Sequence, residues 1–178
     1  MTLPKRPVIG VLHPGVMGAA MGSALKRVAG AVIWAAAGRS QVTSKRAEIA
    51  DLVGVPDLAD LARRSHVIIS ICPPQAALDV AQQVAQALEG QADRPLYVDA
   101  NTVDPAVVLD VGRLLGAEHV VDGVVLGPPA WERGSTVLWL SGHSAQTVAD
   151  LFTDSPFDAR VRGLELGAAS ASARLSKR

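Results

Sequence analysis

VIGVLHPGVMG, residues 8–18, is the stretch from which the fold follows. The β-branched apolar run from Val8 to Leu12 is typical of a buried strand, and small residues at helical spacing follow Gly15. This order predicts a strand, a tight turn and the start of a helix. At a helix start, backbone N–H groups without partners and the positive end of the helix dipole bind phosphate. The stretch therefore predicts a nucleotide-binding turn.

The turn is close to the dinucleotide-binding pattern G-x-G-x-x-G without matching it fully. His13 stands at the position of the first glycine, and Gly15 and Gly18 stand at the second and third. Because Pro14 follows it, we expect His13 to be extended and to have a structural role. An alternative interpretation stays open, in which the small residues only allow the helix to pack closely on the strand.

The composition indicates one aliphatic globular domain, or one domain with a short extension. Of the 178 residues 49% are hydrophobic, and the formal net charge is zero, which argues against a nucleic-acid-binding surface. Three Trp, one Tyr and two Phe leave the core to aliphatic side chains, as in proteins with alternating strands and helices. Cys72 is the only cysteine, and the histidines lack ligand spacing, so neither a disulfide nor a metal site is expected.

The amino-terminal residues MTLPKRPVIG lack the long apolar segment of a signal peptide. No apolar run approaches the roughly 20 residues that a membrane-spanning helix needs. A cytoplasmic protein without a membrane partner is therefore expected.

Short apolar strands alternate with helical segments along the chain. Further strands are predicted at residues 31–35, 66–71, 95–99, 119–126, 136–140 and 158–161. Helices are predicted at residues 16–28, 75–88, 105–115 and 144–152, with a polar helix after residue 40. This alternation predicts an α/β fold, a Rossmann-type doubly wound and mostly parallel sheet, with ligands beyond the carboxyl ends of the strands. The tail from residue 168 is expected to begin a helix with no surface of its own to pack on.

The end of the second strand carries the residue that separates NADP from NAD. Arg39 lies about 20 residues beyond the glycine turn, where such proteins place an acid for the NAD ribose or a cation for the NADP 2′-phosphate. No Asp or Glu lies between Gly18 and Glu48, so NADP is favoured over NAD. In the alternative interpretation, Arg39 and the basic residues after it are a solvated helix start.

The third and fourth strand ends offer further contacts. Cys72 and Pro73 hold the backbone extended where it would press on a ribose, and Cys72 is expected to pack rather than to act as a nucleophile. Asn101 and Thr102 offer an amide and a hydroxyl to a carboxamide or substrate. A helix cap at Thr102 or Asp104 is the alternative.

Together these motifs resemble the β-hydroxyacid dehydrogenase family, which includes 3-hydroxyisobutyrate dehydrogenases, 6-phosphogluconate dehydrogenases and imine reductases. The resemblance extends over residues 7–170, and the order of its motifs makes it specific. The matching pieces are VIGVLHPGVMGAAM from residue 8, GRS at 38–40, ISICPP at 69–74, DANTVDP at 99–105, VVDGVVLGPP at 120–129 and GSTVLWLSG at 134–142.

The resemblance implies a set of ligand contacts. It places the NADP pyrophosphate at the glycine turn, the 2′-phosphate at Arg39 and Ser40, and the ribose at Cys72 and Pro73. The implied cofactor residues are Gly10, Leu12, His13, Pro14, Gly15, Val16, Met17, Gly18, Arg39, Ser40, Cys72, Pro73, Asn101 and Thr102. The implied substrate residues are Thr102, Leu126, Gly127 and Pro128.

The chain departs from this family at its end. Family members carry a lysine as general acid and base on a helix that opens an all-helical second domain. That position falls at about Ala173, and the nearest candidate is Lys177, one helical turn or about 6 Å further on. We therefore expect an NAD(P)-binding domain at residues 1–163 and the truncated start of that helix at residues 164–178, with the helical second domain absent.

Two functions follow from these observations. The first is the NADP-binding domain of an oxidoreductase that transfers a hydride between nicotinamide and a hydroxy acid or related small molecule. Whether this chain turns over by itself stays open, because it lacks the expected lysine and the second domain. The second is a non-catalytic NADP-binding regulatory or interaction module, in which a second copy or a partner chain covers an exposed apolar face. A methyltransferase-type domain is disfavoured, because no acid follows the second strand to hold a ribose.

Overall fold

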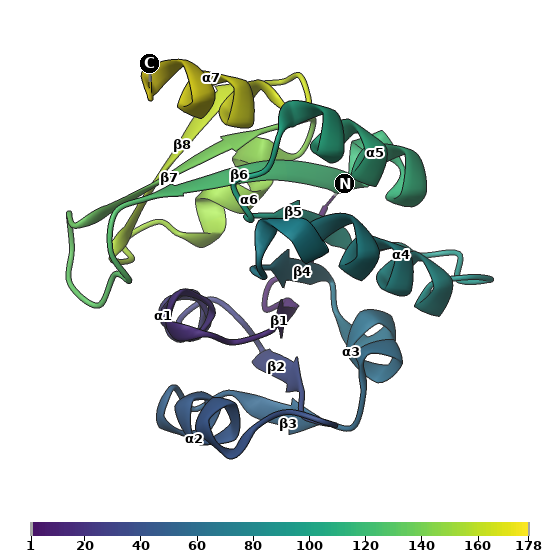
Figure 1. Ribbon diagram of the computed structural model, residues 1–178. Helices are drawn as coiled ribbons and strands as arrows, with labels where there is room; N and C mark the ends of the chain where they lie inside the picture. The colour runs from purple at the N-terminus through teal and green to yellow at the C-terminus, as the bar shows by residue number, and fades with distance from the viewer. Residues whose placement is uncertain (1, 178) are drawn as a thin grey trace.

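The computed structural model describes residues 2–177 and contains one eight-stranded sheet with helices packed on both faces (Figure 1). The strand order is β3-β2-β1-β4-β5-β6-β7-β8. The strands are β1 (Val8–Leu12), β2 (Ala31–Ala35), β3 (Val53–Val55), β4 (Val67–Ser70), β5 (Leu96–Asp99), β6 (Val120–Leu126), β7 (Thr136–Ser141) and β8 (Phe157–Gly163). The helices are α1 (Val16–Leu25), α2 (Gln41–Ile49), α3 (Leu58–Arg64), α4 (Ala77–Ala87), α5 (Pro105–Leu115), α6 (Ala145–Leu151) and α7 (Ala168–Ser176), and the short 3-10 turns are η1 (Pro74–Ala76) and η2 (Ala117–His119).

The sheet reverses its strand order beside β1. The chain runs outward from β1 through β2 to β3, and then crosses back so that β4 pairs with the other side of β1. Ligands of doubly wound sheets bind beside such a reversal, outside the carboxyl ends of the strands. Every pair of neighbouring strands is parallel except β6 and β7. The predicted α/β, doubly wound and mostly parallel fold is therefore confirmed.

The antiparallel pair arises because no helix joins β6 to β7. Residues 127–135 form the connection, and Pro128, Pro129 and Gly134 in it are unsuited to a helix. Gly127 and Gly134 both have positive φ, at 129° and 84°, which the turns of this connection require.

The core has two layers, one on each face of the sheet. Within β4, Val67 and Ile69 join the layer that contains α1 and α6, whereas Ile68 joins the layer that contains α3, α4 and α5. Successive residues of a strand point to opposite faces, so a strand covered on both sides must be apolar at every position. This requirement explains the continuous apolar runs that predicted the strands.

Two elements, β3 and α3, were not predicted from the sequence. The strand has only three residues with Gly54 in the middle, and the helix has only seven, so neither shows a clear period. The sequence did contain one local signal for α3, because Asp57 is a residue type that often caps helices. In the structure its carboxylate accepts a hydrogen bond from the Asp60 N–H at 2.8 Å and caps α3. The helix predicted over residues 16–28 is also shorter, and ends at Leu25.

The expectation that the carboxyl-terminal tail has no surface to pack on is wrong. Helix α7 lies against β6, β7 and β8, with Ala169 and Ala173 buried against Val124 (Figure 1). Small residues one helical turn apart let the helix approach the sheet closely. None of the helices within residues 2–177 has the length and apolar content of a membrane-spanning helix.

Candidate functional site

The turn between β1 and α1 is built around His13. Its φ is 56°, a left-handed conformation that glycine adopts most readily, so the expectation of an extended His13 is wrong. The Gly15 N–H donates to the His13 carbonyl oxygen at 2.6 Å and closes the turn. The signal for this conformation was in the sequence, because His13 occupies the first glycine position of the dinucleotide pattern.

The two glycines after His13 have different tasks. A Cβ atom on Gly18 would lie 3.3 Å from the His13 carbonyl oxygen, so Gly18 allows α1 to approach the turn closely. A Cβ atom on Gly15 would meet only that same oxygen at 3.9 Å, which leaves open space in front of the helix. Gly15 is the N-cap of α1 and supplies no side chain to the first N–H groups of that helix. These N–H groups suit a phosphate.

A cavity of about 380 Å³ lies in front of this helix start. The turn, the end of β2 and the end of β4 all contribute to its walls. The lining residues are His13, Gly15, Val16, Met17, Gly18, Arg39, Thr43, Ile71, Cys72 and Pro73. Eight of the fourteen predicted cofactor residues therefore share one cavity, at the edge of the sheet where a dinucleotide is expected.

The electrostatics of this cavity suit an anion. Arg39 is exposed at its rim, and no Asp or Glu lines it. Burial lowers the pKa of His13 below its ordinary value, and the charge of Arg39 lowers it further, so both favour the neutral imidazole. The His13 Nε2 atom is buried without a hydrogen-bond partner among residues 2–177. A buried polar atom without a partner fits a site that a polar ligand completes.

Several predicted cofactor residues lie outside this cavity. A Cβ atom on Gly10 would lie 2.5 Å from the Ser65 Oγ, so Gly10 serves the packing of β1 against the α3–β4 connection. Leu12 and Pro14 are buried. The Ser40 hydroxyl accepts a hydrogen bond from the Thr43 N–H at 3.2 Å and caps α2.

Of the two other residues of the cavity, sequence reasoning gave Thr43 as a hydroxyl donor beside Arg39 and missed Ile71. Thr43 stands four residues after Arg39, at the start of α2, and Ile71 directly precedes Cys72. Both lie next to predicted residues. Their place in the wall depends on how the ends of β2 and β4 meet, which is a tertiary property.

Asn101 ties the ends of β4 and β5 together. Its Oδ1 atom accepts from the Cys72 N–H at 2.6 Å, and its Nδ2 group donates to the Ser70 Oγ at 3.1 Å. The Asp99 carboxylate in turn accepts from the Asn101 N–H at 3.1 Å. The Asn101 side chain is 4% exposed and both ends of its amide have protein partners, so it positions Cys72. Burial raises the pKa of the Cys72 thiol, which suits a packing role.

Asp122, on β6, anchors helix α7. Its carboxylate accepts from the Ser170 N–H at 2.8 Å, from the Ser170 hydroxyl at 2.6 Å and from the Ser141 hydroxyl at 3.3 Å. The Ser141 Oγ accepts from the Ala169 N–H at 2.8 Å. Asp122 and Ser141 thus satisfy N–H groups in the first turn of α7.

This anchoring brings Lys177 to Thr102. Both line a small cavity of about 200 Å³, together with Val103, Asp104, Ser170, Ala173 and Arg174. Thr102 is exposed with φ of 52°, and Ala173, at the position where the resemblance implies a lysine, is 3% exposed. Arg174 forms an ion pair with Asp104, the N-cap of α5. The structure therefore unites a predicted substrate residue with the nearest candidate lysine.

The predicted substrate loop is arranged differently. Leu126 packs on the cluster formed by Val124, Ala169 and Ala173. The Pro128 carbonyl oxygen accepts from the Thr136 hydroxyl, and a Cβ atom on Gly127 would lie 2.6 Å from the Ser135 carbonyl oxygen. Gly127 and Pro128 thus close the β6–β7 connection on itself. Neither lines the two cavities described above.

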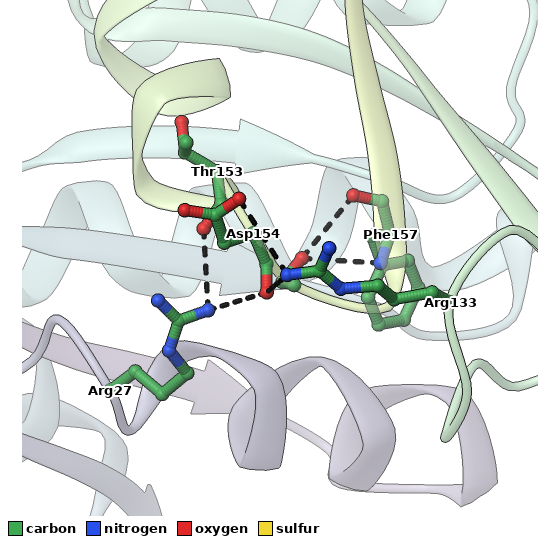
Figure 2. A network of polar contacts seen from close by, with 6 residues as sticks. Arg27, Arg133, Thr153, Asp154 and Phe157 are labelled. Carbon is green, nitrogen blue, oxygen red and sulfur yellow. Dashed lines mark hydrogen bonds and ion pairs between the residues drawn. The ribbon is translucent and has the colours of Figure 1, made fainter.

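Two arginines hold the β6–β7 connection and the turn after α1 to the turn after α6, as Figure 2 shows. Arg133 donates to the Asp154 carbonyl oxygen at 3.2 Å. Arg27 donates to the Thr153 carbonyl oxygen at 3.5 Å and to the same Asp154 oxygen. Cations suit this place, because the carbonyl groups at a helix end lack partners. No local pattern predicts these contacts, which join residues more than 100 positions apart in the case of Arg27.

Many solved structures share this fold, among them the following three. The first is a conserved protein of unknown function whose structure reveals similarity with 3-hydroxyacid dehydrogenases (TM-score 0.82, 25% identity, 95% of this chain and 62% of that chain). The second is a 3-hydroxyisobutyrate dehydrogenase of Mycobacterium tuberculosis (TM-score 0.78, 16% identity, covering 96% of this chain and 59% of that chain). The chain has the fold of the 3-hydroxyacid dehydrogenases. The third, an imine reductase variant from Myxococcus stipitatus in complex with NAD⁺, has a TM-score of 0.70 and 22% identity over 97% of this chain and 60% of that one.

The resemblance inferred from the sequence is thereby confirmed at the level of the fold. No family model matches the chain. An uncharacterized 28.5 kDa protein from the 7S RNA 5′ region of Methanothermus fervidus is 32% identical over 90 residues, which are 51% of this chain and 34% of that protein. The chain thus spans about a third of this curated relative and about 60% of the solved structures.

Proposed function

We propose that this chain binds NADP and forms the nucleotide-binding part of an oxidoreductase that acts on a hydroxy acid or a related small molecule. The carrying observation is that Arg39 lines the same cavity as the first turn of α1, with no acid among the lining residues. The N–H groups of that turn bind the pyrophosphate, and Arg39 binds the 2′-phosphate. An acid for the NAD ribose is missing from this wall, which favours NADP over NAD.

The remaining residues of the site have positioning roles. Cys72 and Pro73 lie against the ribose, and Asn101 holds their backbone through the Cys72 N–H. The bound nicotinamide supplies or accepts the hydride. Lys177 lies beside Thr102 and is the candidate to exchange a proton with the substrate oxygen.

Titration with NADPH and NADH, followed by nicotinamide fluorescence, tests the cofactor assignment. We expect NADPH to bind at least about tenfold more tightly than NADH, equal to about 1.4 kcal/mol. Arg39→Ala should weaken NADPH binding and leave NADH binding unchanged. Arg160→Ala is the control, because it removes the same charge from β8, outside the cavity. Equal binding of both nucleotides, or an Arg39→Ala protein that binds NADPH normally, contradicts the proposal.

A second candidate, an interaction module, is favoured by an apolar groove of about 490 Å³ between α1 and α2. Four large apolar side chains in its walls are strongly exposed: Val16 (52%), Val42 (67%), Ile49 (76%) and Trp131 (55%). Such patches mark interaction surfaces. A module should bind NADP, associate through this groove and catalyse no turnover. Sedimentation of the wild type and of Ile49→Asp, with and without NADP, separates the two: association that Ile49→Asp abolishes supports the module.

A further inference from the structure

A second large cavity, of about 750 Å³, lies at the edge of the sheet opposite the nucleotide cavity. Most of its wall is formed by residues 63–66, from the last turn of α3 to the start of β4, and by residues 91–95, between α4 and β5. The segment 2–4 and His119, which directly precedes β6, complete it. These are the amino-terminal ends of β4, β5 and β6, away from the arrowheads in Figure 1. A ligand here is therefore separate from the proposed NADP site.

The wall of this cavity is rich in cations. It contains Arg63, Arg64 and Arg94, against one carboxylate, Asp93. Arg64 is paired with Asp60 at 3.4 Å. Neither Arg63 nor Arg94 forms an ion pair with any residue in the range 2–177. Two guanidinium groups thus present their hydrogen-bond donors without a protein anion.

Two histidines add further nitrogen atoms. The His66 Nδ1 atom accepts from the Val8 N–H at 2.9 Å, so a neutral His66 carries its proton on Nε2, as a donor. The His119 Nδ1 atom is buried and has no hydrogen-bond partner within residues 2–177. The His119 Nε2 atom lies 3.4 Å from a Glu118 carboxylate oxygen. A ligand oxygen supplies the missing partner of Nδ1, which is a donor when it carries the ring proton.

A purely structural role does not account for all of these cations. Basic residues in the last turn of a helix offset the negative end of its dipole, which suffices for Arg63 and Arg64 in α3. Arg94 lies seven residues beyond the end of α4 at Ala87, where this effect has faded.

We propose that this cavity binds a small polyanion that carries two or more negatively charged oxygen groups, either carboxylates or phosphates. Arg63 and Arg94 pair with separate groups of the ligand, because Arg63 lies in the last turn of α3 and Arg94 in the connection before β5, and His119 donates from Nδ1. Since the site lies at the opposite edge from the proposed cofactor cavity, it serves binding or regulation and not the chemistry. This assignment does not depend on NADP binding.

Isothermal titration calorimetry at low salt with citrate and with inorganic pyrophosphate tests the site and separates the two classes of anion. We expect at least one probe to bind with a dissociation constant below 1 mM (about −4.1 kcal/mol). The double variant Arg63→Ala, Arg94→Ala should weaken that binding at least about tenfold. Arg160→Ala, which removes a charge from β8, should bind as the wild type does. Circular dichroism checks that the variants fold.

The variant Arg39→Ala excludes the other anion site. If it abolishes binding of the probe, the anion occupies the nucleotide cavity and the proposal is wrong. An unchanged affinity in the double variant, or no binding of either probe at 10 mM (about −2.7 kcal/mol), also overturns it. Imidazole resonances give a second readout: the probe should shift His66 and His119 and leave the exposed His143 unchanged.

Discussion

Asp99 and Asp122 occupy matched positions on the neighbouring parallel strands β5 and β6, and both are fully buried. Asp122 accepts three hydrogen bonds, from Ser170 and Ser141, and so holds α7 on the sheet. Asp99 accepts one, from the Asn101 N–H, and its Oδ2 atom has no partner within residues 2–177. Two aspartates that are equally buried therefore have different roles.

The difference teaches that the number of donors, and not the depth of burial, sets the role of each acid. Burial raises the pKa of both carboxyl groups, that of Asp99 to about 6. At Asp122 the serine donors oppose this rise, because they stabilise the ionised form. Asp122 is thus a structural anchor for the helix that carries Lys177. Asp99 is a costly charge beneath the wall of the nucleotide cavity.

The largest effect is expected for Asp122→Ala. It leaves the Ser170 and Ser141 groups without their acceptor, so α7 should detach and the free energy of unfolding should fall by about 3 kcal/mol. Urea denaturation measures the loss, and trypsin should cut after Arg174 faster than in the wild type. Asp158→Ala is the control, since it removes only the exposed ion pair with Arg160 in β8. Equal stability of Asp122→Ala and the wild type would show that the anchor is not needed.

The pH dependence of stability should report Asp99. Its pKa is raised from 3.8 to about 6 in the folded protein, so folding favours the protonated form. Its contribution is complete below pH 3.8 and is lost as the pH rises through about 6, a fall of up to about 3 kcal/mol. Asp122 contributes with the same sign. Urea denaturation between pH 4 and pH 8 measures the slope, which Asp99→Asn should reduce; an unchanged slope contradicts the assignment.

Asn101→Ala should loosen the backbone at Cys72, in the wall of the cavity. The Cys72 N–H loses its acceptor, so we expect NADPH binding to weaken about fivefold, equal to about 1 kcal/mol, and stability to fall by a similar amount. Nicotinamide fluorescence and urea denaturation provide the two readouts. Gln75→Ala, an exposed change in η1 outside the cavity, should alter neither. Lost stability with unchanged NADPH affinity would leave Asn101 a purely structural role.

The smallest effect is expected for Ser170→Ala. It removes one of the three hydrogen bonds to Asp122 and leaves the Ser170 N–H in place, so stability should fall by about 1 kcal/mol. Ser176→Ala, which removes an exposed hydroxyl further along α7, is the matched control in the same urea experiment. If Ser170→Ala loses as much as Asp122→Ala, the hydroxyl and not the carboxylate governs docking.

The sequence by itself determined the class of fold and the place of the cavity to which we assign the nucleotide. Local periods of two and 3.6 residues specify strands and helices, and their alternation specifies a doubly wound sheet. The same sequence positions bring Gly15, Arg39 and Cys72 to one edge, because the strands that precede them are parallel. The short elements β3 and α3 were not predicted, because segments of three and seven residues are too short to show a clear period.

Only the tertiary structure decided which polar groups meet. Asp122 and Ser170 are 48 positions apart, and Arg27 and Asp154 are 127 apart, so no spacing in the sequence relates them. Hydrogen bonds are directional and short, and a shift of about 1 Å breaks them, whereas apolar burial tolerates such shifts. For this reason the pattern of apolar residues predicts the layers of the fold, and the pairing of its buried polar groups is known only from the folded chain.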